Sequence, residues 1–248
     1  MMAPAAAGVP GVVLALVLVL AACGGPAPPT GGASASGNPA TCTVRVTADC
    51  TGYTYANPAP GSVVVTAATS SGGNNREFFW AEQGRNEADQ TVCATFAAGG
   101  GIDQQGVVVR LHMMSGGGIS AITVTRNIWA QVFDIFNFHV WNTAEDPSSP
   151  FTLFGSTVIP GLPVAPEAYP LNLCVRTVSS RNIVQFVVWT RGQGRPGWGS
   201  TTQGGQAVIP AGAPGAGRGG WFAGHLVPGT SMVYTHLSVD GETPTGLP

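Results

Sequence analysis

The chain has 248 residues, of which 44% are hydrophobic and only 9% are charged. Its formal net charge at pH 7 is −2, which excludes the strongly basic balance typical of nucleic-acid-binding domains. The 36 glycines and 20 prolines, with many Val, Thr and Ser residues, favour short strands joined by turns.

Residues 11–22, GVVLALVLVLAA, form an uncharged apolar run near the start of the chain. The run is shorter than the about 20 residues of a membrane-spanning helix and has the length of a signal-peptide core. It ends at Leu20-Ala21-Ala22-Cys23, which resembles the lipobox of bacterial lipoproteins, although no Lys or Arg precedes the core. The resemblance implies a signal peptide over residues 1–22. It also implies acyl chains, palmitate among them, on Cys23, which would anchor the protein at the extracytoplasmic face of the cell membrane. The alternative is an ordinary secretory signal with an incidental cysteine.

Residues 24–41, GGPAPPTGGASASGNPAT, contain no large apolar side chain and cannot bury enough surface to become ordered. We therefore expect a flexible tether over residues 23–41 and a single domain over residues 42–248. All 10 basic residues are arginine, which indicates a GC-rich genome because lysine codons are rich in A and T. Together with the lipobox, this composition predicts an actinobacterial source.

Four further cysteines follow the lipobox, and an even number in an exported chain favours disulfides. Of the three possible pairings we favour Cys42–Cys50, which closes a short loop, and Cys93–Cys174, which joins two strand-like stretches. Four buried free thiols are the alternative. No CxxC or His–Cys spacing favours a zinc site.

From about residue 43 the chain alternates strand-like runs with turns. The clearest runs are 106–114, 121–129, 133–141, 171–190, 221–226 and 232–239. In the first run, strict alternation places Leu111 with Val107 and Val109 on the core face, and Arg110 and His112 on the other face. Within 171–190, the residues Ser179-Ser180-Arg181-Asn182 predict a hairpin turn. The absence of an amphipathic helix predicts a sandwich or barrel.

Two segments carry a family resemblance. The segments YPLNLCVRTVSSRNIVQFVVW (169–189) and GGWFAGHLVPGTSMVYTHLSVDG (219–241) resemble the hairpin and the closing strands of concanavalin A-like and laminin G-like domains. The resemblance covers about residues 76–241 and implies an all-β fold, a two-sheet antiparallel jelly-roll sandwich. Members of this fold bind glycans, hydrolyse them or bind proteins, so the fold alone does not decide the function.

The sequence contains none of the catalytic or metal-binding motifs considered below. Hydrolases of this fold carry Glu-x-Asp-x-x-Glu on one strand, whereas the nearest cluster here, Glu82, Glu87 and Asp89, is typical of a solvated turn. A GxSxG motif is absent, and the glycine runs do not end in GK[ST]. Some relatives of this fold bind calcium, for which Asp103 and Asp240 could serve here, but the sequence contains no dense acidic loop. We therefore expect no enzyme activity, no cofactor and no metal.

Glycan binding remains, because sugar rings offer an apolar C–H face to aromatic rings and hydroxyl groups to planar polar side chains. The strand faces opposite the core supply this mixture. The candidate ligand-binding residues are Arg110, His112, Asn127, Trp129, Asn137, His139, Trp141 and Gln185. The alternative is that Trp129 and Trp141 pack under loops, since tryptophan is usually mostly buried. A loop over 191–220, with Trp198, is expected to flank the site.

These observations predict a lectin-like, non-catalytic protein that binds a carbohydrate or glycoconjugate of the cell envelope. A protein-interaction or structural envelope lipoprotein is the alternative, and a glycoside hydrolase is the least favoured.

Overall fold

The computed structural model describes residues 53–68, 76–80, 84–99, 103–115, 118–129, 133–143, 150–162 and 169–244. Within these ranges the secondary structure consists of thirteen β-strands and one short 3-10 helix, Ser179–Arg181. No helix in this part of the chain has the length and apolar character needed to cross a membrane. The predicted signal peptide, tether and domain start lie outside the described residues and stay predictions, as does the acylation of Cys23.

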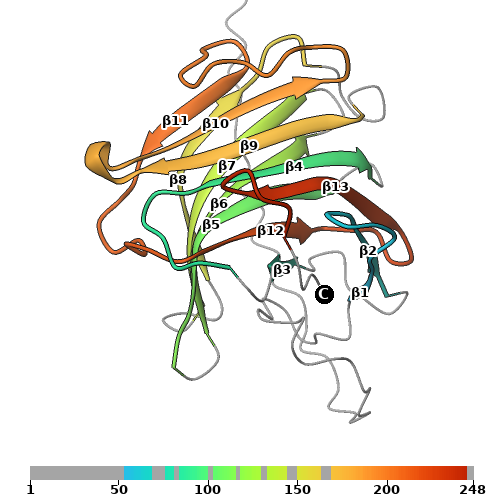
Figure 1. Cartoon of the computed structure of the whole chain (residues 1–248), viewed down its shortest axis with the longest axis horizontal. Helices are drawn as coiled ribbons and strands as arrows, with labels where there is room; N and C mark the ends of the chain where they lie inside the picture. The colour runs from blue at the N-terminus through green and yellow to red at the C-terminus, as the bar shows by residue number, and fades with distance from the viewer. Residues whose placement is uncertain are drawn as a thin grey trace, which may run out of the picture. The chain divides into compact units, whose positions relative to one another are not determined.

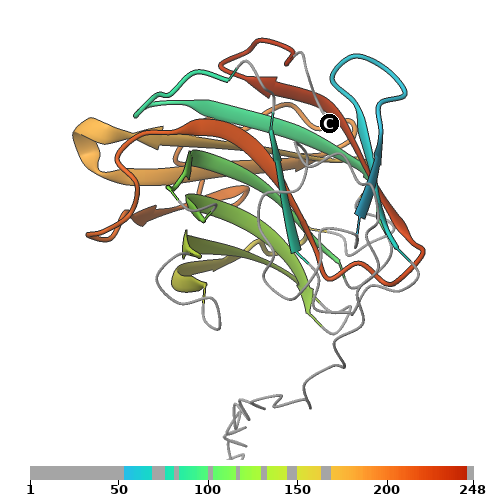
Figure 2. The ribbon, with the colours of Figure 1, turned by 90° about the horizontal axis from the view of Figure 1, so that it is seen from below.

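The strands form two antiparallel sheets that pack face to face (Figures 1 and 2). The seven-stranded sheet has the order β1 (Tyr53–Ala56), β2 (Val63–Ala67), β13 (Ser231–Val239), β4 (Thr91–Ala98), β9 (Leu171–Val178), β10 (Ile183–Thr190) and β11 (Gly204–Val208). The six-stranded sheet has the order β3 (Arg76–Trp80), β12 (Arg218–Gly224), β5 (Gln104–Met113), β6 (Ile119–Trp129), β7 (Phe133–Asn142) and β8 (Phe151–Val158). The predicted all-β, two-sheet jelly-roll sandwich is therefore confirmed.

The main core lies between the sheets and follows from the period-two alternation of the strands. Ile122 and Val124 of β6 point into this core, and so does Phe136 of β7. The Phe136 ring stacks on Phe186 of the opposite sheet, with ring centroids 4.7 Å apart. Each such fully buried side chain stabilises the fold by about 1.5–3 kcal/mol relative to exposure.

A disulfide joins Cys93 of β4 to Cys174 of β9, as predicted. The two residues are directly paired across these neighbouring strands. They alternate with core residues on each strand and so lie on the outer face of the seven-stranded sheet. Cys42 and Cys50 lie outside the described residues.

A β-bulge at Arg110 changes the predicted faces of β5. The register with β6 shifts between Val109 and His112, and Arg110 has a φ of 53°. Because a bulge inserts one extra residue, the side chains beyond it change face. Leu111 therefore packs with Val108 in a second cluster rather than in the main core, and His112 moves to the opposite face. The predicted face assignment of Leu111 and His112 is wrong for this reason.

The predicted hairpin after β9 is confirmed, because the 3-10 turn ends at Asn182 in the left-handed region, with a φ of 50°. The predicted long loop over 191–220 is too long. β11 lies inside this range and pairs with β10, so the loop between these two strands covers only residues 191–203.

Candidate functional site

The outer face of the six-stranded sheet is the face turned away from the other sheet. Four residues of the predicted ligand-binding set lie on it, at positions that alternate with core residues: Asn127 of β6, and Asn137, His139 and Trp141 of β7. The structure therefore brings this part of the predicted set together on one face.

Trp141 on this face is buried, with a relative exposure of only 1% for the residue. Its indole N–H donates a hydrogen bond to Thr123 Oγ1 at 2.9 Å. Its ring packs against Phe151 and Phe78, with centroid distances of 4.8 and 5.0 Å. The expectation that Trp141 offers a free ring face is therefore wrong. The side chain of Trp129 lies outside the described residues.

His139 lies beside Trp141 and is also buried. Its ring meets Phe151 edge-on at 5.1 Å, and its Nδ1 has no hydrogen-bond partner. Burial, and secondarily the positive charge of Arg76, lowers the pKa of His139 to about 4. The imidazole is therefore neutral at physiological pH and packs as part of the aromatic cluster.

The two asparagines on this face form local hydrogen bonds. Asn137 accepts a hydrogen bond from Ser156 Oγ at 2.8 Å. Asn127 donates to the carbonyl and hydroxyl oxygens of Thr125 at 3.5 and 3.4 Å. Their predicted roles in ligand binding stay predictions.

Arg110 is buried and fixes two loops against the bulge of β5. Its guanidinium donates to the carbonyl oxygens of Ala88, at 2.8 Å, and Pro214, at 3.3 Å. Its backbone N–H donates to Gln90 Oε1 at 3.3 Å. These bonds explain how a non-glycine residue is held at positive φ. They also give the Arg110 guanidinium a structural role.

Gln185 lies on the outer face of the seven-stranded sheet, away from the other predicted residues. It is paired with Arg176 of β9 on one side and with Gln206 of β11 on the other. Gln185 Oε1 accepts from Arg176 Nε at 2.9 Å, and Gln185 Nε2 donates to Gln206 Oε1 at 2.8 Å. A chain of three planar polar groups therefore crosses β9, β10 and β11.

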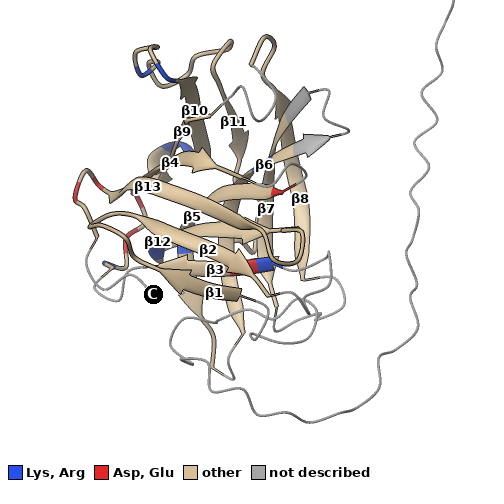
Figure 3. Ribbon diagram, turned by 90° about the vertical axis from the view of Figure 1, so that its right-hand side faces the viewer, with Lys and Arg blue, Asp and Glu red and all other residues tan. Residues whose placement is uncertain are grey.

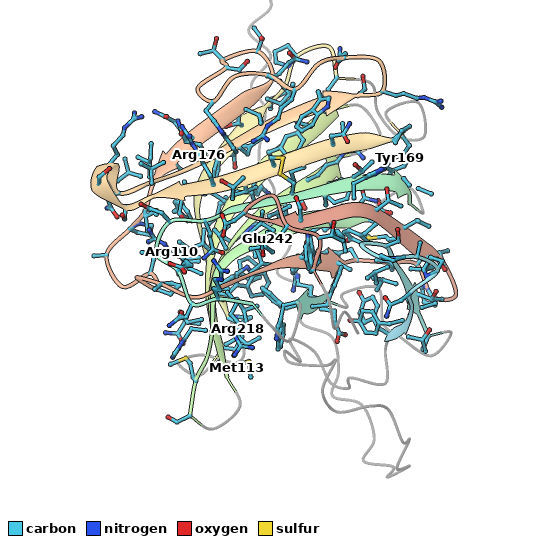
Figure 4. All side chains as sticks on the ribbon, in the orientation of Figure 1. Arg110, Met113, Tyr169, Arg176, Arg218 and Glu242 are labelled. Carbon is cyan, nitrogen blue, oxygen red and sulfur yellow. A yellow bond between two sulfur atoms is a disulfide. The ribbon has the colours of Figure 1, made fainter. Side chains whose placement is uncertain are left out.

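Trp198 in the loop between β10 and β11 folds back over this row. The guanidinium carbon of Arg176 lies 4.5 Å from the Trp198 ring centroid, and that of Arg195 lies 5.0 Å from it. Such cation–π contacts hold guanidinium groups in fixed positions. We call Arg176, Gln185, Arg195, Trp198 and Gln206 the Trp198 surface; Figure 4 labels Arg176 on β9.

The loop that carries Trp198 is fixed by hydrogen bonds around two glutamines. Gln193 Oε1 accepts from the Thr190 backbone N–H at 3.0 Å and from Gln203 Nε2 at 3.1 Å. The Gln203 backbone N–H in turn donates to Ser200 Oγ at 3.1 Å. Because these bonds order the loop in advance, a ligand would not have to meet the entropy cost of ordering it.

Sequence reasoning included Gln185 but missed Arg176, Arg195 and Gln206, and it placed Trp198 only as part of a flanking loop. The alternation of 171–178 did carry a signal, since Arg176 shares the outward parity of Cys174. The approach of Trp198 to Arg176 depends on the loop conformation and left no signal of this kind.

The other acidic side chains of the described segments lie in separate places. Asp89 accepts hydrogen bonds from Ser179 in the hairpin turn, and Asp240 accepts from the Thr91 backbone N–H. Glu77 and Asp103 are buried. Among the residues that the structure describes, no three His, Cys, Asp or Glu side chains gather as a metal ion would require.

No protein-family model matches the chain, and no curated protein matches it. Among solved structures it is similar to a legume lectin-like domain from Entamoeba histolytica, at 9% identity and a TM-score of 0.45, covering 76% of this chain and 83% of that chain. It is also similar to the carbohydrate-binding module CBM66 from Bacillus subtilis, at 10% identity and a TM-score of 0.39, covering 77% and 92% of the two chains. A third is an alginate lyase from Pseudomonas aeruginosa, at 9% identity and a TM-score of 0.34, covering 74% of each chain. At these identities and TM-scores the neighbours do not indicate a function, which has to be inferred from the residues of this chain.

Proposed function

We propose that this protein is a non-catalytic carbohydrate-binding protein and that the Trp198 surface is its glycan site. The observation that carries the proposal is the hydrogen-bonded row from Arg176 through Gln185 to Gln206, with the Trp198 indole packed on its guanidinium end. Planar amide and guanidinium groups suit the vicinal hydroxyl groups of a sugar, because they present hydrogen-bonding atoms at fixed spacing.

The row retains hydrogen-bonding capacity for a ligand. Gln206 is exposed, and within the described residues its amide nitrogen has no acceptor. Arg176 donates to Gln185 through Nε alone, so among the described residues its terminal N–H groups have no acceptor and remain available to a ligand. Gln185 is 3% exposed and holds its two neighbours in register rather than meeting a ligand itself.

We propose further that the protein is acylated at Cys23 and displayed on the extracytoplasmic face of the cell membrane. The apolar run 11–22 and the Leu20-Ala21-Ala22-Cys23 sequence support this location. A glycan or glycoconjugate of the cell envelope is then the ligand within reach.

A glycan array probed with the full chain, purified in mild detergent, tests the proposal. We expect binding to at least one bacterial envelope glycan, and a loss of at least about tenfold for Trp198→Ala. Val227→Ala is the control, because it removes an exposed apolar side chain away from the Trp198 surface. Thermal unfolding of each variant checks that the fold is kept.

Two results would contradict the proposal. If no envelope glycan binds, a protein-interaction role takes its place, with partner capture from native membranes as the next experiment. If a bound glycan is shortened on incubation, the non-catalytic assignment fails.

A further inference from the structure

The arginines of this chain are distributed unevenly. Residues 168–239 contain five arginines and no Asp or Glu, although the whole chain carries 12 acidic residues. Three of these arginines lie on or beside the Trp198 surface: Arg176 and Arg195 contact Trp198, and the charge of Arg181 acts on Arg176. Figure 3 shows this end of the molecule, with β10, β11 and the loop between them. A local positive charge is therefore present on a chain whose net charge is −2.

Two of these guanidinium groups converge on one indole ring. Because Arg176 and Arg195 both contact Trp198, their charges are separated by no more than the sum of the two contact distances. Within the described part of the chain, neither forms an ion pair with a carboxylate. The positive charge of Arg195 is one of the causes that lower the pKa of Arg176, so the two charges repel each other. An anion that binds both groups would relieve this repulsion.

The surroundings of Arg176 show the same imbalance of charge. The residue is half-buried, and burial is the largest cause that lowers its pKa. The positive charges of Arg181 and Arg195 lower the pKa further. Arg176 stays protonated at neutral pH, since arginine does not titrate in that range. The site therefore holds a cation that lacks a counter-ion among its described neighbours.

The free edge of Arg176 is suited to a planar or tetrahedral anion. Its Nε bonds Gln185, so its terminal N–H groups form the remaining edge of the fork. A guanidinium fork matches the geometry of carboxylate and phosphate oxygens, and such charge-assisted bonds are about twice as strong as neutral ones. A neutral sugar would further desolvate these charges and would not neutralise them.

We propose that the glycan recognised at the Trp198 surface is anionic, with an acidic group of the sugar bound by Arg176 and Arg195. This inference rests on the proposed function and names the ligand class of that same site. The acidic group is a carboxylate or a phosphate carried by the sugar, since guanidinium geometry accepts both.

Calorimetric titration of the full chain with matched polymers tests the inference. The probes are a polyuronate, the same polymer after reduction of its carboxyl groups to alcohols, and a phosphate-bearing glycan of similar length. We expect at least one anionic polymer to bind at least about tenfold more tightly than the reduced polymer. Its affinity should also fall as the salt concentration rises. The anionic polymer that binds more tightly identifies the acidic group.

Arginine variants assign the effect to this surface. Arg176→Gln and Arg195→Gln should each weaken binding of the anionic polymer by about five- to twentyfold and make it less sensitive to salt. Arg176→Lys keeps the positive charge but not the guanidinium fork. Its affinity for the anionic polymer should therefore lie between that of Arg176→Gln and that of the unmodified chain. Arg85→Gln is the matched control, because Arg85 is an exposed arginine on a different segment. The affinity of this variant for the anionic polymer should stay within about twofold of that of the unmodified chain.

Three outcomes would overturn the inference. The first is equal affinity for the polyuronate and its reduced form, with Trp198→Ala still abolishing binding; the proposed function would then stand with a neutral glycan. The second is equal loss of anion binding in Arg85→Gln and Arg195→Gln, which would show non-specific attraction. The third is the absence of binding to every glycan on the array, which overturns the proposed function itself.

Discussion

The outer faces of the two sheets carry different kinds of residue. On the six-stranded sheet, Phe78, Trp141 and Phe222 form a buried aromatic cluster with ring centroids 5.0–5.6 Å apart. On the seven-stranded sheet, the row through Gln185 is polar and runs from the half-buried Arg176 to the exposed Gln206, with Trp198 half-buried over the Arg176 end. The same fold therefore uses one outer face for packing, while on the other face Arg176 and Gln206 keep N–H groups without an acceptor among the described residues.

This difference shows that the location of an aromatic residue on a strand does not define its role. Trp141 and Trp198 both lie outside the main core, and only their surroundings distinguish them. Trp141 contributes to stability because other rings cover it. Trp198 contributes to the placement of charged groups, because guanidinium groups are what it contacts.

The largest expected effect is on the aromatic face. Trp141→Ala removes a fully buried ring and the hydrogen bond to Thr123, and should lower the free energy of unfolding by about 3–5 kcal/mol. Trp198→Ala should lower it by less than about 1 kcal/mol, because that ring is only half-buried. Chemical denaturation measures both. Similar losses in the two variants would contradict the division of roles between the faces.

The second-largest effect on stability is expected from the disulfide on the outer face of the seven-stranded sheet. Replacing both Cys93 and Cys174 by Ala removes a cross-link between residues 81 positions apart and should cost about 2–4 kcal/mol of stability. The measurement is the denaturation midpoint of the double variant against the oxidised chain. An unchanged midpoint would mean that the unfolded chain gains little freedom when the link is lost.

The aromatic face should also make stability depend on pH. His139 has a pKa of about 4 when folded and its ordinary value of 6.5 when unfolded, so between these values the unfolded chain binds more protons. The contribution of neutral His139 to the free energy of unfolding is therefore fully present above about pH 6.5. It is lost as the pH falls towards 4, which lowers the free energy of unfolding by about 2–3 kcal/mol. His139→Phe should remove this part of the pH dependence. Equal pH profiles for the variant and the unmodified chain would contradict the assignment.

The smallest expected effect on stability is on the polar face. Arg176→Gln leaves the strands intact and removes one hydrogen bond to Gln185, so we expect a loss of about 0.5–1 kcal/mol. Thermal unfolding monitored in parallel with glycan binding measures both quantities on one sample. A loss comparable with that of Trp141→Ala would show that Arg176 is mainly structural.

Much of the fold follows from local patterns in the sequence. The alternation in β6 and β7 predicted Asn127, Asn137 and Trp141 on the faces opposite the core, and the structure places them there. The pairing of Cys93 with Cys174 was also predictable. Both are in strand-like runs at positions that alternate with core residues, and two such cysteines can face each other only if their strands are neighbours.

The failures arose where a tertiary contact overrides the alternation. Glycine usually supplies the positive φ of a bulge, and here Arg110 adopts it because Ala88, Gln90 and Pro214 hold the residue. The burial of Trp141 depends on Phe78, which is distant in the sequence. The Trp198 surface depends on side-chain hydrogen bonds inside a loop, and no periodic pattern encodes those.

The position of the disulfide also determines how the domain would respond to mechanical load. The segment between Cys93 and Cys174 includes four strands of the six-stranded sheet, from β5 to β8. A force that pulls on the two ends of the chain passes through the S–S bond and bypasses this segment. The fully stretched oxidised chain is therefore shorter than the reduced chain by roughly 280 Å, at about 3.5 Å for each of the enclosed residues. Under tension, these four strands would be released from the sandwich without being pulled straight.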